Sequence, residues 1–182
     1  TATATTGSNA DGLYSDSGSI YTGDIDGTIT AVAGIDNAAG LYSDSGRIYT
    51  GEINGTITAD ANNYVYGLYA NGKIDVDGIS GTITATAADS NAAGLYSSNG
   101  SIDVDDKDID GTITATAGTN NAYGLYSSGG SSIYTGAING TITADANTGS
   151  GAYGLYANGH LDVDGIGSGA LISAMAGQNN AY

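Results

Sequence analysis

Short runs of alternating apolar and polar residues follow one another along the whole chain. Between residues 73 and 77, for example, the sequence reads Lys-Ile-Asp-Val-Asp, with an aliphatic residue at every second position. This alternation is the pattern of a β-strand with one buried face, and the helical period of 3.6 residues is nowhere visible. Glycines such as Gly18, Gly23 and Gly27 separate the runs and allow sharp turns between them. The pattern therefore predicts short strands joined by tight corners.

The strand pattern is organised by the tripeptide Gly-Leu-Tyr, which occurs six times. Its copies begin at Gly12, Gly40, Gly67, Gly94, Gly124 and Gly154, so that successive copies lie 28, 27, 27, 30 and 30 residues apart. A repeat of this length indicates a stacked architecture, in which each unit buries its apolar side against its neighbours. We therefore expect each copy to mark one coil of a stack.

When the six copies are aligned, four positions are aliphatic in every coil. The four columns are Leu13, Leu41, Leu68, Leu95, Leu125 and Leu155; Ile20, Ile48, Ile74, Ile102, Ile133 and Leu161; Ile25, Ile53, Ile79, Ile109, Ile138 and Ile166; and Ile29, Ile57, Ile83, Ile113, Ile142 and Ile172. Strands that carry these columns would pair with their equivalents one coil away, at about 4.8 Å. We predict an all-β fold, a β-solenoid (β-helix) with a single chain path, about six coils of 27–30 residues and three short parallel strands in each coil. We expect the coil to be right-handed.

Residues 1–182 are expected to form a single repeat domain with a longer period of three coils. The sequence of residues 51–62 nearly recurs at 136–147, and that of residues 66–72 recurs at 153–159. The next Gly-Leu-Tyr would be due at position 183, and residues 1–4 resemble the Thr-Ile-Thr-Ala strand. We therefore expect a solenoid that is open at both ends, with strand edges that can pair with another coil.

The composition agrees with a repetitive strand protein and restricts its partners. Proline, cysteine, phenylalanine and tryptophan are absent, whereas 31 of the 182 residues are glycine and 14 are tyrosine, as in turn-rich repeats. The 19 acidic residues outnumber the 3 lysines and arginines, and the formal charge of -16 repels phosphate backbones and anionic lipids. The apolar runs are too short to span a bilayer. We expect neither nucleic-acid binding nor membrane insertion.

The tyrosines of Gly-Leu-Tyr are the first candidate functional residues. They form a column of six, namely Tyr14, Tyr42, Tyr69, Tyr96, Tyr126 and Tyr156. If the leucine points inward, strict alternation places these rings outside, although a bulge at the preceding glycine would change the parity. An outer aromatic ladder is suited to assembly by lateral packing or to stacking on sugar rings.

A second candidate is a face of threonines from the repeated Thr-Ile-Thr. Two parallel rows are expected to point outward, formed by Thr28, Thr30, Thr56, Thr58, Thr82, Thr84, Thr112, Thr114, Thr141 and Thr143. The array is similar to the Thr-x-Thr face of β-helical antifreeze proteins, and this likeness implies ice binding. Threonine is also favoured on outward strand positions for structural reasons alone.

Aspartates on the second strand of adjacent coils are a third candidate. Asp75 and Asp77 precede Asp103 and Asp105 by one coil, and stacked carboxylates about 4.8 Å apart repel each other. Ca²⁺ is the oxygen-seeking ion that would relieve this repulsion. The nonapeptide of calcium-loaded solenoids is absent, and the alternative is an acidic face in contact with water.

Residues suited to catalysis are few. His160 is the only histidine, and it shares a column with Arg47 and Lys73. Lys73 beside Asp75 and Asp77 resembles, faintly, the basic and acidic groups of β-helical polysaccharide lyases, but scattered charges on an outer face explain them equally well. We expect no enzymatic activity, and no cofactor apart from calcium.

Residues 121–144 combine Asn-Ala-Tyr-Gly-Leu-Tyr-Ser-Ser with Ser-Ile and with Ile-Asn-Gly-Thr-Ile-Thr-Ala. This run resembles the β-helical passenger repeats of bacterial autotransporter and haemagglutinin-like surface proteins, and the likeness extends over essentially the whole chain. The resemblance implies a β-solenoid fold and an extracellular or cell-surface location.

Our leading hypothesis is a secreted structural protein that builds an extracellular filament or surface stalk by end-to-end stacking of coils. Its partner would be another copy of itself or the flanking repeats of a longer chain. The first alternative is a cell-surface adhesin or glycan-binding module, and the second is ice binding.

Overall fold

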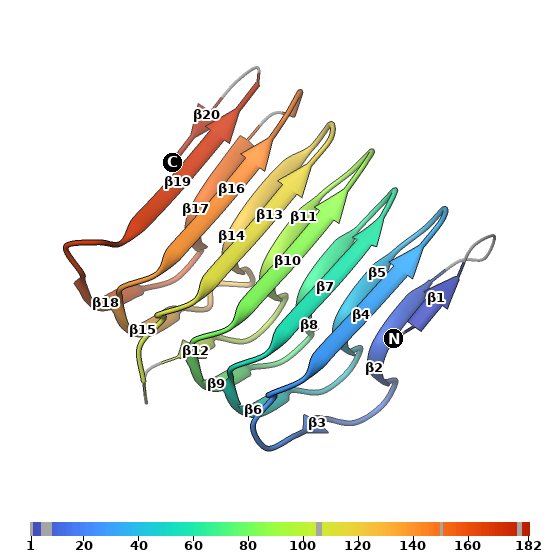
Figure 1. The fold of residues 1–182 in the computed structure, drawn as a ribbon, viewed down its shortest axis with the longest axis horizontal. Helices are drawn as coiled ribbons and strands as arrows, with labels where there is room; N and C mark the ends of the chain where they lie inside the picture. Colours follow the sequence, from blue (N-terminus) through green and yellow to red (C-terminus); the bar gives the residue numbers. More distant parts are fainter. Residues whose placement is uncertain (1, 5–8, 105–106, 150, 178–179) are drawn as a thin grey trace.

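A computed structural model of the chain forms a β-solenoid of about six coils (Figure 1). It describes residues 2–4, 9–104, 107–149, 151–177 and 180–182. All regular secondary structure in these ranges is β-strand, which confirms the predicted fold class. Among the same residues, there is no helical segment with the length and apolar character needed to cross a membrane.

Sheet A is formed by the Thr-Ile-Thr-Ala segments, in a parallel arrangement of seven strands. In spatial order its strands are β1 (Ala2–Ala4), β4 (Thr28–Ala33), β7 (Thr56–Ala61), β10 (Thr82–Ala87), β13 (Thr112–Ala117), β16 (Thr141–Ala146) and β19 (Leu171–Ala176). The register pairs equivalent residues, so that Ile83 lies between Ile57 and Ile113. Each sequence column therefore becomes a ladder of like side chains.

Sheet B is formed by the six segments that contain Gly-Leu-Tyr and by the short strand β20, which makes seven parallel strands. Its strands are β2 (Ala10–Ser15), β5 (Ala38–Ser43), β8 (Val65–Ala70), β11 (Ala92–Ser97), β14 (Asn121–Ser127), β17 (Gly151–Ala157) and β20 (Asn180–Ala181). Leu95 pairs with Leu68 on one side and with Leu125 on the other. The leucine column is thus one continuous inner ladder.

Sheet C closes the coil with six parallel strands. These are β3 (Ile20–Tyr21), β6 (Ile48–Ile53), β9 (Ile74–Ile79), β12 (Ile102–Val104), β15 (Ile133–Ile138) and β18 (Leu161–Ile166). The shorter strands β3 and β12 are followed by single bridges at Ile25 and Ile109, which keep the third aliphatic column in register. Three sheets of equivalent strands therefore enclose one interior.

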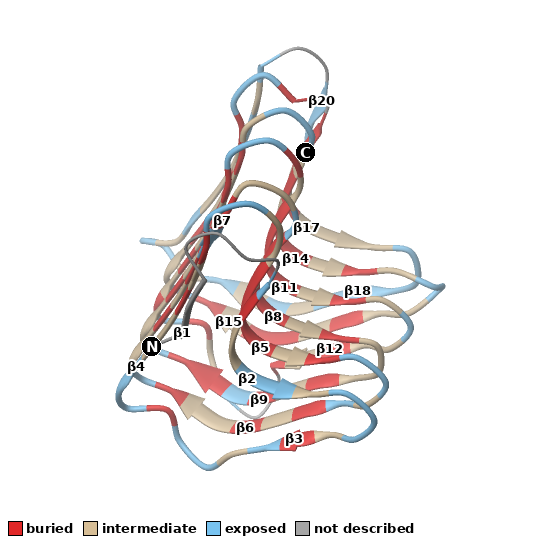
Figure 2. Ribbon diagram, turned by 90° about the vertical axis from the view of Figure 1, so that its right-hand side faces the viewer, coloured by how far each residue is buried: buried red, intermediate tan, exposed pale blue. Residues whose placement is uncertain are grey.

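The interior has two compartments of different width. The wider one is enclosed by all three sheets and holds the leucine and isoleucine columns, for example Ile83 and Leu95. The narrower one lies between sheets A and B alone and is filled almost entirely by alanine, for example Ala85 and Ala92. Because alanine side chains are small, the two sheets approach each other closely there, and the coil narrows toward one end (Figure 2). The four predicted columns account only for the wider compartment.

The glycine of Gly-Leu-Tyr interrupts the alternation of sheet B. In β8, Gly67 and Leu68 are both buried, whereas Tyr66 and Tyr69 on either side of them lie on the outer face. The glycine is also skipped in the residue-by-residue pairing of the strands. Because the glycine is skipped in both strands alike, the register is kept, and the tyrosine of the motif stays outside because Gly67 and Leu68 both face inward.

Buried serines join sheet B to sheet C at the next corner. The hydroxyl of Ser97 donates to the carbonyl oxygen of Gly72 at 2.7 Å and accepts from the backbone nitrogen of Gly100 at 3.0 Å. Ser43 makes the corresponding bond to the carbonyl oxygen of Gly18, at 2.8 Å. These bonds satisfy polar groups that the corner would otherwise bury without partners.

Candidate functional site

The six tyrosines that follow Gly-Leu lie side by side on the outer face of sheet B and form what we call the tyrosine column: Tyr14, Tyr42, Tyr69, Tyr96, Tyr126 and Tyr156. Ring centroids are 4.5 Å apart for Tyr42 and Tyr69 and 4.7 Å apart for Tyr96 and Tyr126, and both pairs are stacked. Tyr69 and Tyr96 meet edge to face at 5.4 Å. Such pairs stabilise by about 0.5–1.5 kcal/mol beyond the area that they bury.

A second outer column runs beside the first, three residues earlier in each strand. Its members are Asp11, Ala39, Tyr66, Ala93, Tyr123 and Tyr153, and we call it the side column. Tyr123 stacks on Tyr126 of its own strand at 4.3 Å and on Tyr153 of the next coil at 5.2 Å. The sequence analysis did not assign these tyrosines. The signal that it left unused is the tetrapeptide Tyr-Gly-Leu-Tyr, present in three of the six coils.

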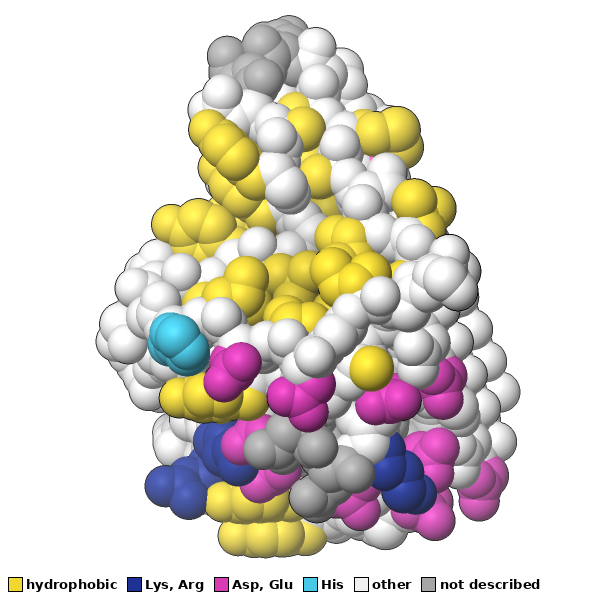
Figure 3. All heavy atoms as spheres, turned by 90° about the vertical axis from the view of Figure 1, so that its left-hand side faces the viewer, with side chains coloured by type: hydrophobic (Ala, Val, Ile, Leu, Met, Phe, Trp, Pro, Cys, Tyr) yellow, Lys and Arg dark blue, Asp and Glu magenta, His cyan; other side chains and the backbone are white. Residues whose placement is uncertain are grey.

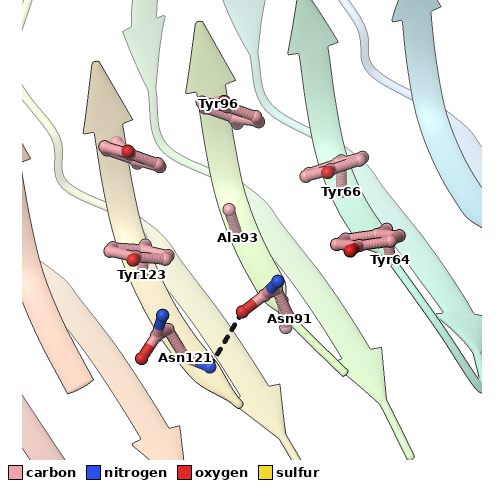
Figure 4. Close-up of a pocket in the computed structure, with 9 residues that line it drawn as sticks. Tyr64, Tyr66, Asn91, Ala93, Tyr96, Asn121 and Tyr123 are labelled. Atoms are coloured by element: carbon pink, nitrogen blue, oxygen red, sulfur yellow. Dashed lines mark hydrogen bonds between the residues drawn. The ribbon is translucent and has the colours of Figure 1, made fainter. Parts of the chain in front are cut away.

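Where the side column has alanine between larger residues, the surface is hollowed. A cavity of about 220 Å³ opens above Ala93, and Tyr66, Tyr96 and Tyr123 are among its lining residues (Figure 4). A similar cavity of about 180 Å³ opens above Ala39. Tyr64 and Tyr66 line both cavities. We call them the Ala93 slot and the Ala39 slot.

Three tyrosines of this face, Tyr42, Tyr66 and Tyr123, are held in the neutral form. Burial raises the pKa of Tyr66 well above its ordinary value, and the neighbouring hydroxyls of Tyr96 and Tyr69 raise it further. Burial also raises the pKa of Tyr42 and of Tyr123, because a phenolate loses more solvation than a phenol. These three side chains are therefore uncharged at any ordinary pH.

This environment predicts a pH dependence of stability. A tyrosine whose pKa is raised on folding binds its proton more tightly in the folded state, so its stabilising effect is complete below the unfolded pKa of about 10 and is lost at higher pH. We expect the free energy of unfolding to fall as the pH rises from about 9 to about 11. The absorbance of tyrosinate should appear at a higher pH in the folded protein than in the urea-unfolded chain. Identical absorbance titrations of folded and unfolded protein would contradict this expectation.

The candidate aspartates are only partly brought together. Asp75 and Asp103 lie on adjacent coils, and the ammonium of Lys73 contacts their carboxylates at 2.8 Å and 2.6 Å. Lys73 therefore already supplies positive charge to this pair. Asp77 is exposed, and Asp105 lies outside the described residues. Across the part of the chain that the structure describes, no three or more acidic or histidine side chains are placed to hold a metal ion, and the calcium site stays a prediction.

The threonine rows lie on the outer face of sheet A. Equivalent threonines are paired from coil to coil, as in Thr56 with Thr82 and Thr82 with Thr112. In coils three and four a third threonine, Thr86 or Thr116, extends the row, whereas Asp60 takes that place in coil two. The last coil has Leu171 and Ser173 instead. Ice binding by this face stays a prediction.

The lysine and arginine side chains on the sheet C side of the coil each have their own partners. Arg47 donates to the hydroxyl of Tyr49 at 2.9 Å, while Lys73 pairs with the aspartates described above. Lys107, which the sequence analysis did not single out, pairs with Glu52 two coils away at 2.7 Å. These contacts are those of an outer face, where ion pairs contribute little to stability.

Comparisons with protein families, with curated proteins and with solved structures found no match for this chain. Its geometry alone therefore defines the class to which it belongs. Three parallel sheets, whose strands recur once in each coil, make the protein a β-solenoid.

Proposed function

We propose that the protein is a structural β-solenoid, which builds an extracellular filament or surface stalk by end-to-end stacking of coils. The supporting observation is the apolar face of the C-terminal coil. Ile166 is 65% exposed and Leu161 is 46% exposed, whereas their column neighbours Ile138 and Ile133 are fully buried. Hydrophobic side chains gather across the middle of this end of the molecule (Figure 3).

A further coil of the same kind would complement this face. Its inner columns would cover the exposed aliphatics, each contributing about 1.5–3 kcal/mol when fully buried. Its strands would also pair with β18 and β19, each of which has one neighbouring strand in the described structure. Because every coil carries the same columns, a coil from a second copy or from flanking repeats offers matching side chains. Exposed strand edges with a repeated register favour this kind of growth.

The extracellular location rests on one observation, the resemblance of residues 121–144 to the passenger repeats of bacterial surface proteins. The strongly acidic composition keeps neighbouring rods apart by charge repulsion, which favours separate fibres over lateral clumps. Fractionation of the producing cells would test the location.

The stacking proposal is tested with charges placed on the exposed end. We expect the purified chain to form rods longer than one stack of about 30 Å (six coils at about 4.8 Å) in electron micrographs. The double substitution Ile166→Glu and Leu161→Glu is expected to leave dispersed particles, because stacking would bury two unpaired carboxylates. Ile35→Glu, at an exposed lateral position, is the matched control and should still form rods. Dispersed wild-type particles at high concentration would contradict the proposal.

A further inference from the structure

The Ala93 slot is a missing rung in an aromatic column. Tyr66 and Tyr123 belong to strands β8 and β14, which pair with β11 on its two sides, so Ala93 lies between two tyrosines. Figure 4 shows Tyr66 on one side of Ala93 and Tyr123 on the other, with Tyr96 at one end. Tyr123 is stacked both on Tyr153 of the adjacent coil, at 5.2 Å, and on Tyr126 of its own strand, at 4.3 Å, so its ring is held in place at the side of the slot. The slot is therefore bounded by aromatic rings along the solenoid axis.

The width of the slot corresponds to one inserted ring. Strands β8 and β14 are two strand spacings apart, a distance of about 9.6 Å. A flat aromatic ring in contact with two walls needs about 7–8 Å, at about 3.5–4.0 Å to each wall. The gap therefore has room for one ring, such as a pyranose chair, and equally for the tyrosine that the column carries at other coils.

Polar groups at the open end of the slot suit hydroxyl ligands. The side-chain oxygen of Asn91 accepts a bond of 2.9 Å from the backbone nitrogen of Asn121, which leaves the amide nitrogen on the side nearer Ala93 (Figure 4). The Tyr66, Tyr96 and Tyr123 hydroxyls add groups that both donate and accept. Stacked aromatic faces combined with a few convergent polar groups are typical of small-ligand sites.

The charge of the surroundings restricts the ligand further. Lysine and arginine are absent from the residues that line either slot, and Asp11 lines the Ala39 slot. A carboxylate accepts hydrogen bonds from sugar hydroxyls, but it repels an acidic sugar. The overall charge of -16 acts in the same direction.

We propose that the Ala93 slot and the Ala39 slot each bind one neutral pyranose ring of a glycan, inserted edge-on against the shared wall Tyr66. The stoichiometry is two rings per chain. This inference goes beyond the structural role. A rod that fails to bind sugar would contradict the sugar-binding proposal and leave the stacking proposal intact. A chain that stays dispersed but binds sugar would contradict the stacking proposal and leave the sugar-binding proposal intact.

The side column itself supplies the test variants. Ala93→Tyr and Ala39→Tyr each add the residue that the column already carries at three other coils, so the fold should accept them. We expect calorimetric titration with neutral oligosaccharides of glucose and of N-acetylglucosamine to give two sites for the wild type, one for each single variant and none for the double variant. Ala137→Tyr, on the outer face of sheet C, is the matched control and should retain two sites.

The shared wall gives an independent measurement. Tyr66→Ala is expected to weaken binding at both slots by about tenfold or more, because each ring loses one aromatic face. An acidic oligosaccharide, oligogalacturonate, should not bind. The inference is overturned if the wild type binds none of the neutral sugars, or if the double alanine-to-tyrosine variant binds as well as the wild type. It is also overturned if N-acetyltyrosine amide occupies the slots and the sugars do not.

Discussion

Gly94→Ala is expected to destabilise the solenoid by about 3 kcal/mol or more, although alanine is usually the better strand residue. A Cβ atom at this position would lie 2.6 Å from the carbonyl oxygen of Gly124 and would collide with Cγ2 of Ile113. The first contact is with backbone of the next coil and the second is with the core, so neither neighbour can move away freely. Urea unfolding followed by circular dichroism measures the loss.

Gly27→Ala is the matched control for this substitution. A Cβ atom at Gly27 would meet no atom within 4 Å, and the change also reduces the entropy of the unfolded chain. We expect its stability to lie within about 0.5 kcal/mol of the wild type or slightly above it. Equal effects of the two substitutions would show that the interior does not require the glycine of Gly-Leu-Tyr.

Ile109→Ala is expected to cost about 2–5 kcal/mol, as does the loss of a large aliphatic side chain from other well-packed cores. Ile109 is fully buried and bridges Ile79 below and Ile138 above. The cavity would therefore lie in the middle of the stack, where stability depends on contacts between neighbouring coils. We also expect the free energy of unfolding to depend less steeply on the urea concentration, since the two halves of the stack would begin to unfold separately.

The control for this prediction comes from the same column. Ile166 occupies the equivalent position in the last coil but is 65% exposed, so Ile166→Ala should cost less than about 1 kcal/mol. The measurement is made in dilute protein, where end-to-end association does not cover Ile166. A large loss for Ile166→Ala under these conditions would contradict the exposed state of the terminal coil.

The period and the alternation predicted the fold because both are local properties of the sequence. Ile83, for example, belongs to a column that is aliphatic in every coil and is flanked by threonines, which predicts an inward position, and it lies in the wider compartment. The narrow compartment was missed, because alanines such as Ala85 and Ala92 are common in strands, corners and helices alike. Nothing in their identity indicates that two sheets close over them.

Contacts between coils were harder to predict than contacts within a strand. Lys73 was noted beside Asp75 on its own strand, but its second partner, Asp103, depends on the register between coils. Lys107 pairs with Glu52 across two coils, a separation that no local pattern indicates. The slots depend on the same kind of information, because Ala93 becomes a cavity floor only when Tyr66 and Tyr123 are stacked on either side.

The hydrogen bonds of all three sheets run along the axis of the stack, so a pull on its ends would act directly against them. Coils would then detach one at a time, beginning at an end where fewer neighbours hold them. Each coil contributes about 4.8 Å to the stack, but its 27–30 residues extend to about 90–100 Å once released. Under tension, each coil that the rod gives up would thus lengthen about twentyfold, and the rod would act as an extensible tether.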